Sequence, residues 1–244
     1  MMEYFDSNAT VGVLGGGPPG AGLTAPALAE RMARYGIARA LVCSTASLEY
    51  NPREGNRLLA REIAPHENLS PLYTLTPDEG SIEEAAVLLP SRPFAALLLP
   101  DRDHHNFSLR EWCAGPLLAS LERRRVPVFV RPAPAGWEEV AAVLDAHPRL
   151  ALVATHTGYR ADRYIYPLAR RYPRLFVETS MYVGHRQLEE FARDFGAARL
   201  LFGTNLPYYT PGAAMAVLAY ARLSAEERAR IAGLNLEDLL GEQA

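Results

Sequence analysis

The sequence predicts a single (β/α)8 barrel of the TIM-barrel type, with extra helices at its C-terminal end. Its 244 residues are close to the length of about 250 that is typical of such barrels. Short apolar runs alternate with amphipathic stretches eight times along the chain. Some runs, such as FAALLL at 94–99, are apolar throughout, as parallel strands buried on both faces require. No Ser-, Gly- or Pro-rich linker divides the chain, so residues 1–244 are expected to form one domain.

The eight candidate strands are short runs rich in Leu, Val and Ala, each bounded by polar or turn-forming residues. They occupy residues 4–8, 38–43, 69–75, 94–100, 126–131, 150–155, 175–179 and 200–204. Because parallel strands need a crossover between them, a helix is expected after each run.

The stretches between the strands show helical spacing of their apolar residues and recognisable ends. In the first, Thr24 can cap the N-terminus, and Gly36 stands where a left-handed C-terminal residue belongs. The others lie at 53–63, 81–89, 109–124, 136–146, 160–171, 185–195 and 211–221. Two further stretches, 225–232 and 236–240, exceed the eight repeats and are expected to close one end of the barrel.

Composition excludes several classes of function. The net charge of -3 offers no broad basic field for nucleic acid. No apolar run approaches the roughly 20 residues of a membrane span, and the N-terminal residues MMEYFDSN do not resemble a signal peptide. We therefore expect a cytoplasmic protein that binds neither nucleic acid nor membrane. All 25 basic residues are arginine, which excludes a Schiff-base lysine, a Walker-A lysine and a carbamylated-lysine metal bridge.

A glycine-rich segment at 15–20 formally satisfies the dinucleotide-binding pattern G-x-G-x-x-G. Pro18 and Pro19 remove backbone N–H donors that a pyrophosphate needs, and the next helix does not begin until about residue 24. No acidic residue ends the second strand, where a ribose partner would stand. A loop over the barrel mouth is the better interpretation.

The active site of a barrel lies where its strands end and the following loops begin. Because Asp6, Asn8 and Thr10 alternate along a strand, their side chains are expected to point the same way. The polar residues at the eight strand ends are Asp6, Asn8, Thr10, Ser44, Thr74, Thr76, Asp101, His104, His105, Arg131, His156, Glu178, Ser180 and Asn205.

Six segments together resemble the amidohydrolase-related (amidohydrolase 2) family of metal-dependent barrel hydrolases and decarboxylases. DSNATVG at 6–12 is similar to that family's D-x-H-x-H-x-G, and MARYGIARALVCST at 32–45 to its M-x-x-x-G-I-x-x-A-V. LALVATHTG at 150–158 resembles the strand that ends in H-x-G, and LLFGTNLP at 200–207 resembles L-L-F-G-[ST]-D-x-P. GNRLLAREI at 55–63 and LERRRVPVFVRPA at 121–133 are similar to two further landmarks.

The resemblance implies a divalent metal such as zinc, but most of the ligand positions carry other residues. Of five such positions only His156 is kept, while the others have become Asn8, Thr10, Arg131 and Asn205. Zinc and similar ions prefer histidine nitrogens and carboxylates, with about three protein ligands in a catalytic site. We therefore expect no metal ligands and no cofactor, with the guanidinium of Arg131 keeping a cation in the pocket.

His156 and Glu178 are the candidate catalytic residues. An unperturbed histidine titrates near neutral pH, so His156 is expected to serve as general acid or base, or it is a hydrogen-bonded remnant of the family site. Glu178 is a candidate base or a partner of Arg131 or His156, or a carboxylate that stabilises a sheet end. If Arg131 is free it can clamp a carboxylate or phosphate, and if it pairs with Asp6 it is structural.

The candidate substrate-binding residues are Arg131, Asn8, Thr10, Asn205, His104 and Tyr208. His104 follows the fourth strand and either enters the pocket from above or belongs to a solvated polar loop. Tyr208 follows the eighth strand and either lines the pocket or packs within its loop. The expected ligand is a small anionic molecule, and assembly into a homo-oligomer stays open.

Three functions are compatible with this sequence. The first is a metal-independent hydrolase or decarboxylase that acts on a small carboxylate-bearing or cyclic substrate. The second is a non-catalytic relative that binds a small ligand or a protein partner. The third is a metal-dependent hydrolase whose site is rebuilt from residues such as Asp6, His104, His105, His156 and Glu178.

Overall fold

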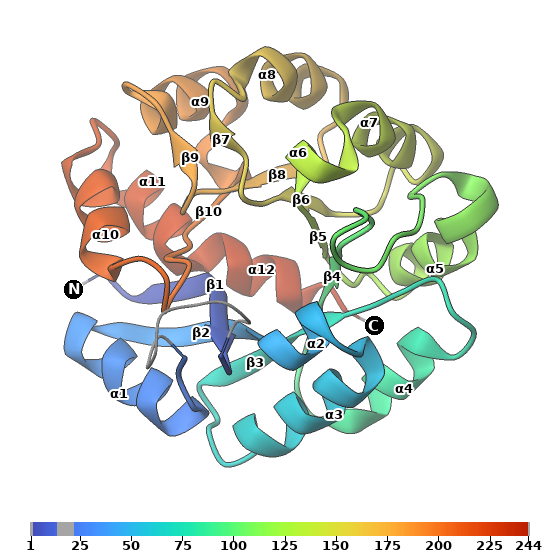
Figure 1. The fold of residues 1–244 in the computed structure, drawn as a ribbon. Helices are drawn as coiled ribbons and strands as arrows, with labels where there is room; N and C mark the ends of the chain where they lie inside the picture. Colours follow the sequence, from blue (N-terminus) through green and yellow to red (C-terminus); the bar gives the residue numbers. More distant parts are fainter. Residues whose placement is uncertain (1, 14–21, 244) are drawn as a thin grey trace.

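The computed structural model describes residues 2–13 and 22–243, and it forms the predicted (β/α)8 barrel (Figure 1). The parallel strands follow the chain in the order β1, β2, β3, β4, β5, β6, β8 and β10. Their bounds are Tyr4–Val11, Ile37–Ser44, Leu69–Thr74, Ala95–Leu98, Val128–Val130, Leu152–Ala154, Leu175–Glu178 and Leu200–Leu201. The glycine-rich segment at 15–20 lies outside the described residues.

The ring closes between the first and last strands through the backbone. Ser7 N donates to Phe202 O at 2.9 Å, and Thr10 N donates to Leu206 O at 2.8 Å. The segment that follows β10 is therefore held against β1, which brings residues from the two ends of the chain to one place.

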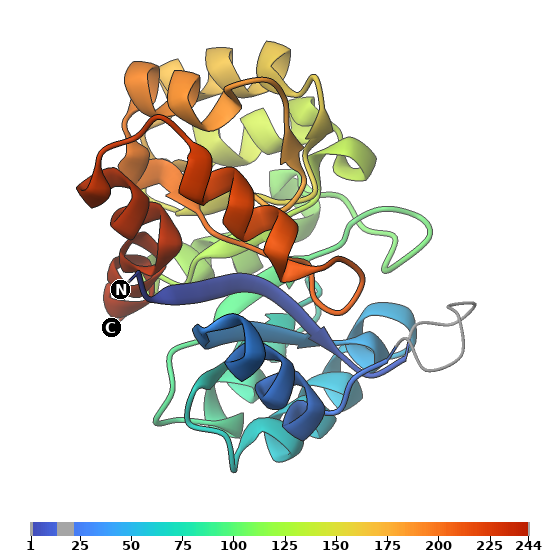
Figure 2. The same ribbon diagram turned by 90° about the vertical axis from the view of Figure 1, so that its left-hand side faces the viewer.

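Helices cover the outside of the barrel (Figures 1 and 2). In α1 the Thr24 side chain accepts from Ala27 N and Gly36 is left-handed, so both predicted helix ends are confirmed. The α-helices α1 to α12 span Ala25–Tyr35, Thr45–Glu49, Pro52–Ile63, Ser81–Leu88, Glu111–Arg123, Pro132–Ala135, Trp137–Ala146, Asp162–Arg171, Gln187–Phe195, Pro211–Tyr220, Ala225–Ala229 and Asn235–Gly241. A small ribbon of β7 (Gly158–Tyr159) and β9 (Tyr182–Val183) was not predicted.

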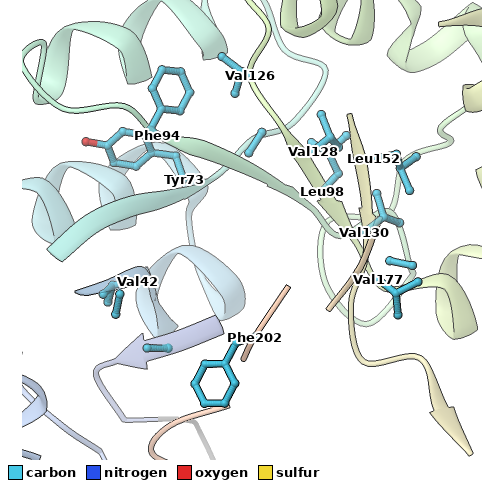
Figure 3. Close-up of a cluster of buried hydrophobic side chains, with 14 of the residues drawn as sticks. Val42, Tyr73, Phe94, Leu98, Val126, Val128, Val130, Leu152, Val177 and Phe202 are labelled. Carbon is cyan, nitrogen blue, oxygen red and sulfur yellow. The ribbon is translucent and has the colours of Figure 1, made fainter. Parts of the chain in front are cut away.

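The core has two layers, as strands that are apolar on both faces require. The larger layer lies between the strands and the helices, and Figure 3 shows part of it, including Val128, Val130 and Leu152. The second layer fills the barrel with side chains such as Phe129, Phe176 and Leu201. The polar side chains at the strand ends therefore lie above this filling.

The C-terminal helices close the barrel end from which the strands start, as predicted. Leu236, Leu239 and Leu240 of α12 belong to the apolar cluster inside the barrel. Asn235 Nδ2 donates to the carbonyl groups of Ala197 and Leu200, at 2.8 and 2.9 Å. The open end of the barrel is thus the one at which the strands finish.

The first strand departs from the regular alternation that was expected for Asp6, Asn8 and Thr10. Asp6 pairs with Ala40 of β2, but Ala9 pairs with Val42, so three steps along β1 face two steps along β2. Such a bulge shifts the direction of the side chains that follow it. The prediction that these three side chains point the same way is therefore wrong. No helix in the described part of the chain is long and apolar enough to cross a membrane.

Candidate functional site

Glu178, at the end of β8, is the centre of a buried hydrogen-bond network at the open end of the barrel. Its Oε2 accepts from Thr155 Oγ1 at 2.7 Å, from Ser180 Oγ at 2.9 Å and from Asn8 Nδ2 at 3.2 Å. Its side chain is fully buried, and burial raises the pKa of its carboxyl group. Glu178 therefore joins β1, β6 and β8, and Asn8 is part of that junction.

Gly203, next to β10, is the residue that makes room for Glu178. A Cβ atom at this position would lie 2.0 Å from Glu178 Oε1 and 2.7 Å from its Cδ. No side chain fits at that distance, so the glycine of LLFGTNLP is required by the buried carboxylate beside it.

Asp6 does not pair with Arg131; the end of the last strand binds it instead. Asp6 Oδ1 accepts from Thr204 N at 2.9 Å and from Asn8 N at 3.0 Å, and Thr204 Oγ1 donates to Oδ2. Burial raises the pKa of Asp6 to about 6, although these hydrogen bonds lower it. Asp6 therefore fastens β1 to the segment after β10, and the interpretation of Arg131 as its structural partner is wrong.

His156 follows β6 in a left-handed backbone conformation, with φ of 51°. Its Nδ1 lies 3.0 Å from Thr155 Oγ1. Because Thr155 gives its only hydroxyl proton to the Glu178 carboxylate, it must accept from His156, which places the imidazole proton on Nδ1. Asn205, also left-handed with φ of 56°, forms a hydrogen bond with the His156 side chain.

The His156 imidazole is held in its neutral form. Burial, and after it the positive charge of Arg131, lower its pKa to about 3, while the hydrogen bond with Asn205 acts in the opposite direction. The imidazole of this structure is therefore uncharged at neutral pH. Burial is the larger of the two causes, and the charge of Arg131 adds to it.

Arg131 is a cation that has no anionic partner among residues 2–13 and 22–243. It follows β5 and precedes α6, and it forms no ion pair with any residue that the structure describes. Its Nε is buried and has no hydrogen-bond partner. The charge of Arg131 also acts on the pKa of Cys43 and of Tyr208, so the guanidinium lies among these side chains and His156.

Thr10 and Tyr208 border this cation. Thr10 Oγ1 is 3.2 Å from the Cys43 Sγ, and both residues are buried. The Tyr208 hydroxyl is buried and has no hydrogen-bond partner within the described part of the chain, and burial raises its pKa to about 12. The free thiol of Cys43 is buried and lies beside Thr10 and Arg131.

The loop after β4 carries His104 and protrudes from the open end of the barrel (Figure 2). Asp101 Oδ1 lies 2.7 Å from His104 Nδ1, while Asp101 Oδ2 and His105 Nε2 are buried and have no hydrogen-bond partner among the residues that the structure describes. Burial, together with the nearby His104, lowers the pKa of His105. This loop is thus folded around its own polar groups at the rim of the site.

The remaining polar strand ends form a separate structural group around β3. Ser47 Oγ is 2.9 Å from Thr74 Oγ1, and Thr76 donates to Asp78. Asn56 Nδ2 donates to Thr74 O at 2.8 Å, and Thr74 N donates to Asn56 Oδ1 at 3.1 Å. The Gly-Asn landmark at 55–56 therefore fixes the end of β3.

The donor set at the mouth does not fit a divalent metal. Across residues 2–13 and 22–243, no three His, Cys, Asp or Glu side chains come together as ligands. Asp6 and Glu178 are saturated by hydrogen bonds from neighbouring groups, and the family position at Arg131 carries a positive charge. The rebuilt metal site considered from the sequence is thus not assembled by these residues.

Sequence reasoning missed two residues that join the site. Thr155 links His156 to Glu178, and Thr204 holds Asp6. Both lie next to a family position, in ATH at 154–156 and GTN at 203–205. The sequence could have indicated both residues, because each is a threonine directly before a polar residue at a strand end.

Comparison with known proteins assigns this chain to a family. A family model described as Amidohydrolase matches residues 51–241, and no curated protein matches the chain. A 2,6-dihydroxybenzoate decarboxylase complexed with 2,6-dihydroxybenzoate is 17% identical, with a TM-score of 0.78 over 99% of this chain and 100% of that one.

Two further solved structures have the same fold. A dihydroxybenzoic acid decarboxylase from Polaromonas sp. JS666, with bound manganese and 2-nitroresorcinol, is 16% identical (TM-score 0.78, over 99% of this chain and 97% of that one). A putative 2-pyrone-4,6-dicarboxylic acid hydrolase from Pseudomonas putida is also 16% identical (TM-score 0.75, over 99% and 98%). At identities this low, the solved structures establish only the fold of this chain. The match to the family model establishes its family. The chain is a member of the amidohydrolase family.

Proposed function

We propose that this protein is an amidohydrolase-family enzyme that hydrolyses or decarboxylates a small carboxylate-bearing or cyclic substrate without a divalent metal. The observation that carries the proposal is the state of Arg131. Its guanidinium has a buried, unpartnered Nε and no ion pair within the described residues, at the barrel end where family members act.

A partly buried cation whose Nε lacks a partner favours an anionic ligand. A guanidinium can bind a carboxylate with two parallel hydrogen bonds, and removal from water strengthens that attraction. Leaving the buried Nε without a partner is costly, so a bound carboxylate would supply the missing interaction. Arg131 would then provide the positive charge that a metal ion provides elsewhere.

Binding of an anion would also change His156. The charge of Arg131 is one cause of the low pKa of His156, and a carboxylate on Arg131 would offset that charge. The pKa of His156 would then rise, while burial would still hold it below its usual range, and the neutral imidazole would act as a base toward the substrate or water. In this proposal His156 is the catalytic residue, and Glu178 positions it through Thr155.

The other candidates take supporting roles. Asn205 orients His156 through their hydrogen bond, and the unpartnered Tyr208 hydroxyl is available to a ligand. Asn8 is already hydrogen-bonded to Glu178, and Thr10 to Cys43. Both would therefore form part of the pocket wall. His104 would contact the substrate from the rim, with its ring held by Asp101.

A second candidate function is binding without chemistry. The same unpaired Arg131 supports it, because an arginine that holds a carboxylate need not be next to a reacting atom. Ligand turnover separates the two functions, as described next.

The test uses full-length protein treated with a chelator and measured by calorimetry and by product analysis. The probes are 2,6-dihydroxybenzoate, 2-pyrone-4,6-dicarboxylate and benzoate. We expect at least one to bind without added metal, and Arg131→Gln to weaken that binding at least tenfold. Arg110→Gln, which removes an exposed arginine 3.6 Å from Glu139, is the matched control.

Each outcome decides between the candidates. Binding with release of carbon dioxide or of a ring-opened product supports the enzyme, and binding without product supports the non-catalytic function. Binding or turnover that appears only with manganese or zinc, with stoichiometric metal in the protein, overturns the metal-independent proposal. If wild type and Arg131→Gln bind the probes with equal affinity, Arg131 does not hold the anion and the proposal is overturned.

A further inference from the structure

Helix α10 has a composition that does not suit its place on the surface. Its sequence, PGAAMAVLAY, contains no charged residue, and among its side chains only Pro211 and Leu218 are buried. Val217 is 59% exposed and Tyr220 is 87% exposed. A helix that is apolar on all sides is normally buried. In the single chain, α10 instead leaves an apolar face exposed to water.

The apolar face continues beyond the helix toward α1. Tyr35 and Tyr209 are exposed beside the N-terminal end of α10, and Tyr35 Oη is 3.2 Å from Thr210 Oγ1. In Figure 2, α10 lies on the outer surface, above β1 and α1. We define the α10 face as α10 together with these two tyrosines.

A groove of about 460 Å³ lies at one end of the α10 face. Its lining includes Arg31, Arg34, Tyr35, Tyr209 and Pro211. The exposed ring of Tyr220 lies at the opposite end of the helix, about 15 Å away for ten residues. One surface thus carries a projecting aromatic ring and a groove with two guanidinium groups, which attract aromatic faces.

We propose that the α10 face binds a second copy of this chain about a twofold axis near Ala216. Antiparallel pairing of the two α10 helices places Tyr220 of each copy in the groove of the other. Such self-complementarity is what an isologous interface requires, because the same patch must serve both copies. The two uncharged helices would form the dry centre of the interface.

The charges at the two ends of the α10 face are complementary under this symmetry. Arg31 lines the groove at the N-terminal end, and Glu226 is exposed in α11, just past the C-terminal end. Neither forms an ion pair with any described residue. The twofold axis brings Arg31 of one copy toward Glu226 of the other, which favours a second copy over an unrelated partner.

The area needed by a stable dimer is consistent with this arrangement. A standard interface buries about 800 Å² on each partner, more than a helix of about 15 Å can supply alone. The remainder would come from α1 and from the segment 221–229 that flanks α10. The groove wall at 206–211 follows Asn205 directly and includes Tyr208, so the partner would also pack against a segment of the proposed active site.

The first test is the mass of the full-length protein in solution, measured by light scattering after size exclusion at micromolar concentrations. We expect twice the 26.8 kDa of the chain. Val217→Glu should give the monomer mass with an unchanged circular dichroism spectrum. The matched control is Val87→Glu, at a valine that is 72% exposed on α4, and it should remain a dimer. A monomeric wild type, or a dimeric Val217→Glu, overturns the proposal.

Charge reversal tests the orientation of the two copies. Arg31→Glu and Glu226→Arg should each weaken dimerisation by about threefold to tenfold, and the double variant should recover most of the loss. Additive weakening in the double variant overturns the proposed antiparallel pairing.

A cross-link tests the position of the axis without relying on a disrupted variant. In a Cys113→Ser background, Ala216→Cys should form a disulfide-linked dimer on mild oxidation, whereas Val87→Cys should not. Equal cross-linking of the two, or none at Ala216→Cys, places the contact elsewhere. These measurements require no ligand, so their failure is independent of the proposed function.

Discussion

Arg131 and His156 lie close enough at the open end of the barrel for the guanidinium charge to lower the pKa of the imidazole. Burial is the larger cause of the low pKa of His156, about 3, and the charge of Arg131 adds to it. In the metal-dependent pattern the corresponding positions would both ligate an ion. Here one carries a fixed positive charge and the other is kept neutral beside it.

The first prediction concerns this pair. Arg131→Gln removes the positive charge and should raise the pKa of His156 above its wild-type value of about 3, because burial stays unchanged and only the repulsion is lost. The measurement is a nitrogen-detected NMR titration of the imidazole from pH 3 to 8. Arg110→Gln serves as the control, since Arg110 lies beside Glu139. A wild-type His156 that titrates near 6.5 would contradict the account given for the site.

The second prediction concerns Gly203. Gly203→Ala would place a methyl group within 2.0 Å of the buried Glu178 Oε1, which has no space to move without breaking its bonds to Thr155 and Ser180. Overpacking of this kind costs about 1–3 kcal/mol or more in free energy of unfolding.

Chemical denaturation measures this cost. Gly241→Ala is the matched control, because a Cβ atom there meets nothing within 4 Å, and it should be neutral. Equal stability of the two variants would show that Glu178 does not occupy the described position.

The third prediction concerns Asp6 and the pH dependence of stability. Its pKa is raised from 3.8 to about 6 by burial, so between these values the folded state binds more protons than the unfolded state. The contribution of Asp6 is therefore most favourable below pH 4, decreases as the pH rises to 6, and is constant above that. At about 1.4 kcal/mol per pKa unit, the decrease is on the order of 3 kcal/mol.

The difference in unfolding free energy between wild type and Asp6→Asn isolates this contribution from that of other carboxyl groups. Measured from pH 4 to 7, wild type should lose stability relative to the variant, with the change centred near pH 5. A difference that stays flat, or that rises with pH, would mean that Asp6 ionises normally in the folded protein.

The eight strands were predictable because each is a local apolar run bounded by polar residues, and the ends of α1 were predictable because Thr24 and Gly36 act on their own helix. The two layers of the core follow from strands that are apolar on both faces. The family could also be predicted, since its landmarks are short segments of sequence. The unpaired state of Arg131 was one of two alternatives that the sequence left open.

The sequence by itself determined which residues stand at the strand ends. The hydrophobic periodicity and the turn-forming residues that reveal those ends are local properties of the chain. Only the tertiary structure decided what those residues do to one another. The bulge in β1 arises from its register with β2, the partner of Asp6 comes from Thr204 at the other end of the chain, and the neutral state of His156 follows from burial and a charge on another strand. Desolvation and Coulomb interactions depend on distances in space, and no pattern along the sequence contains those distances.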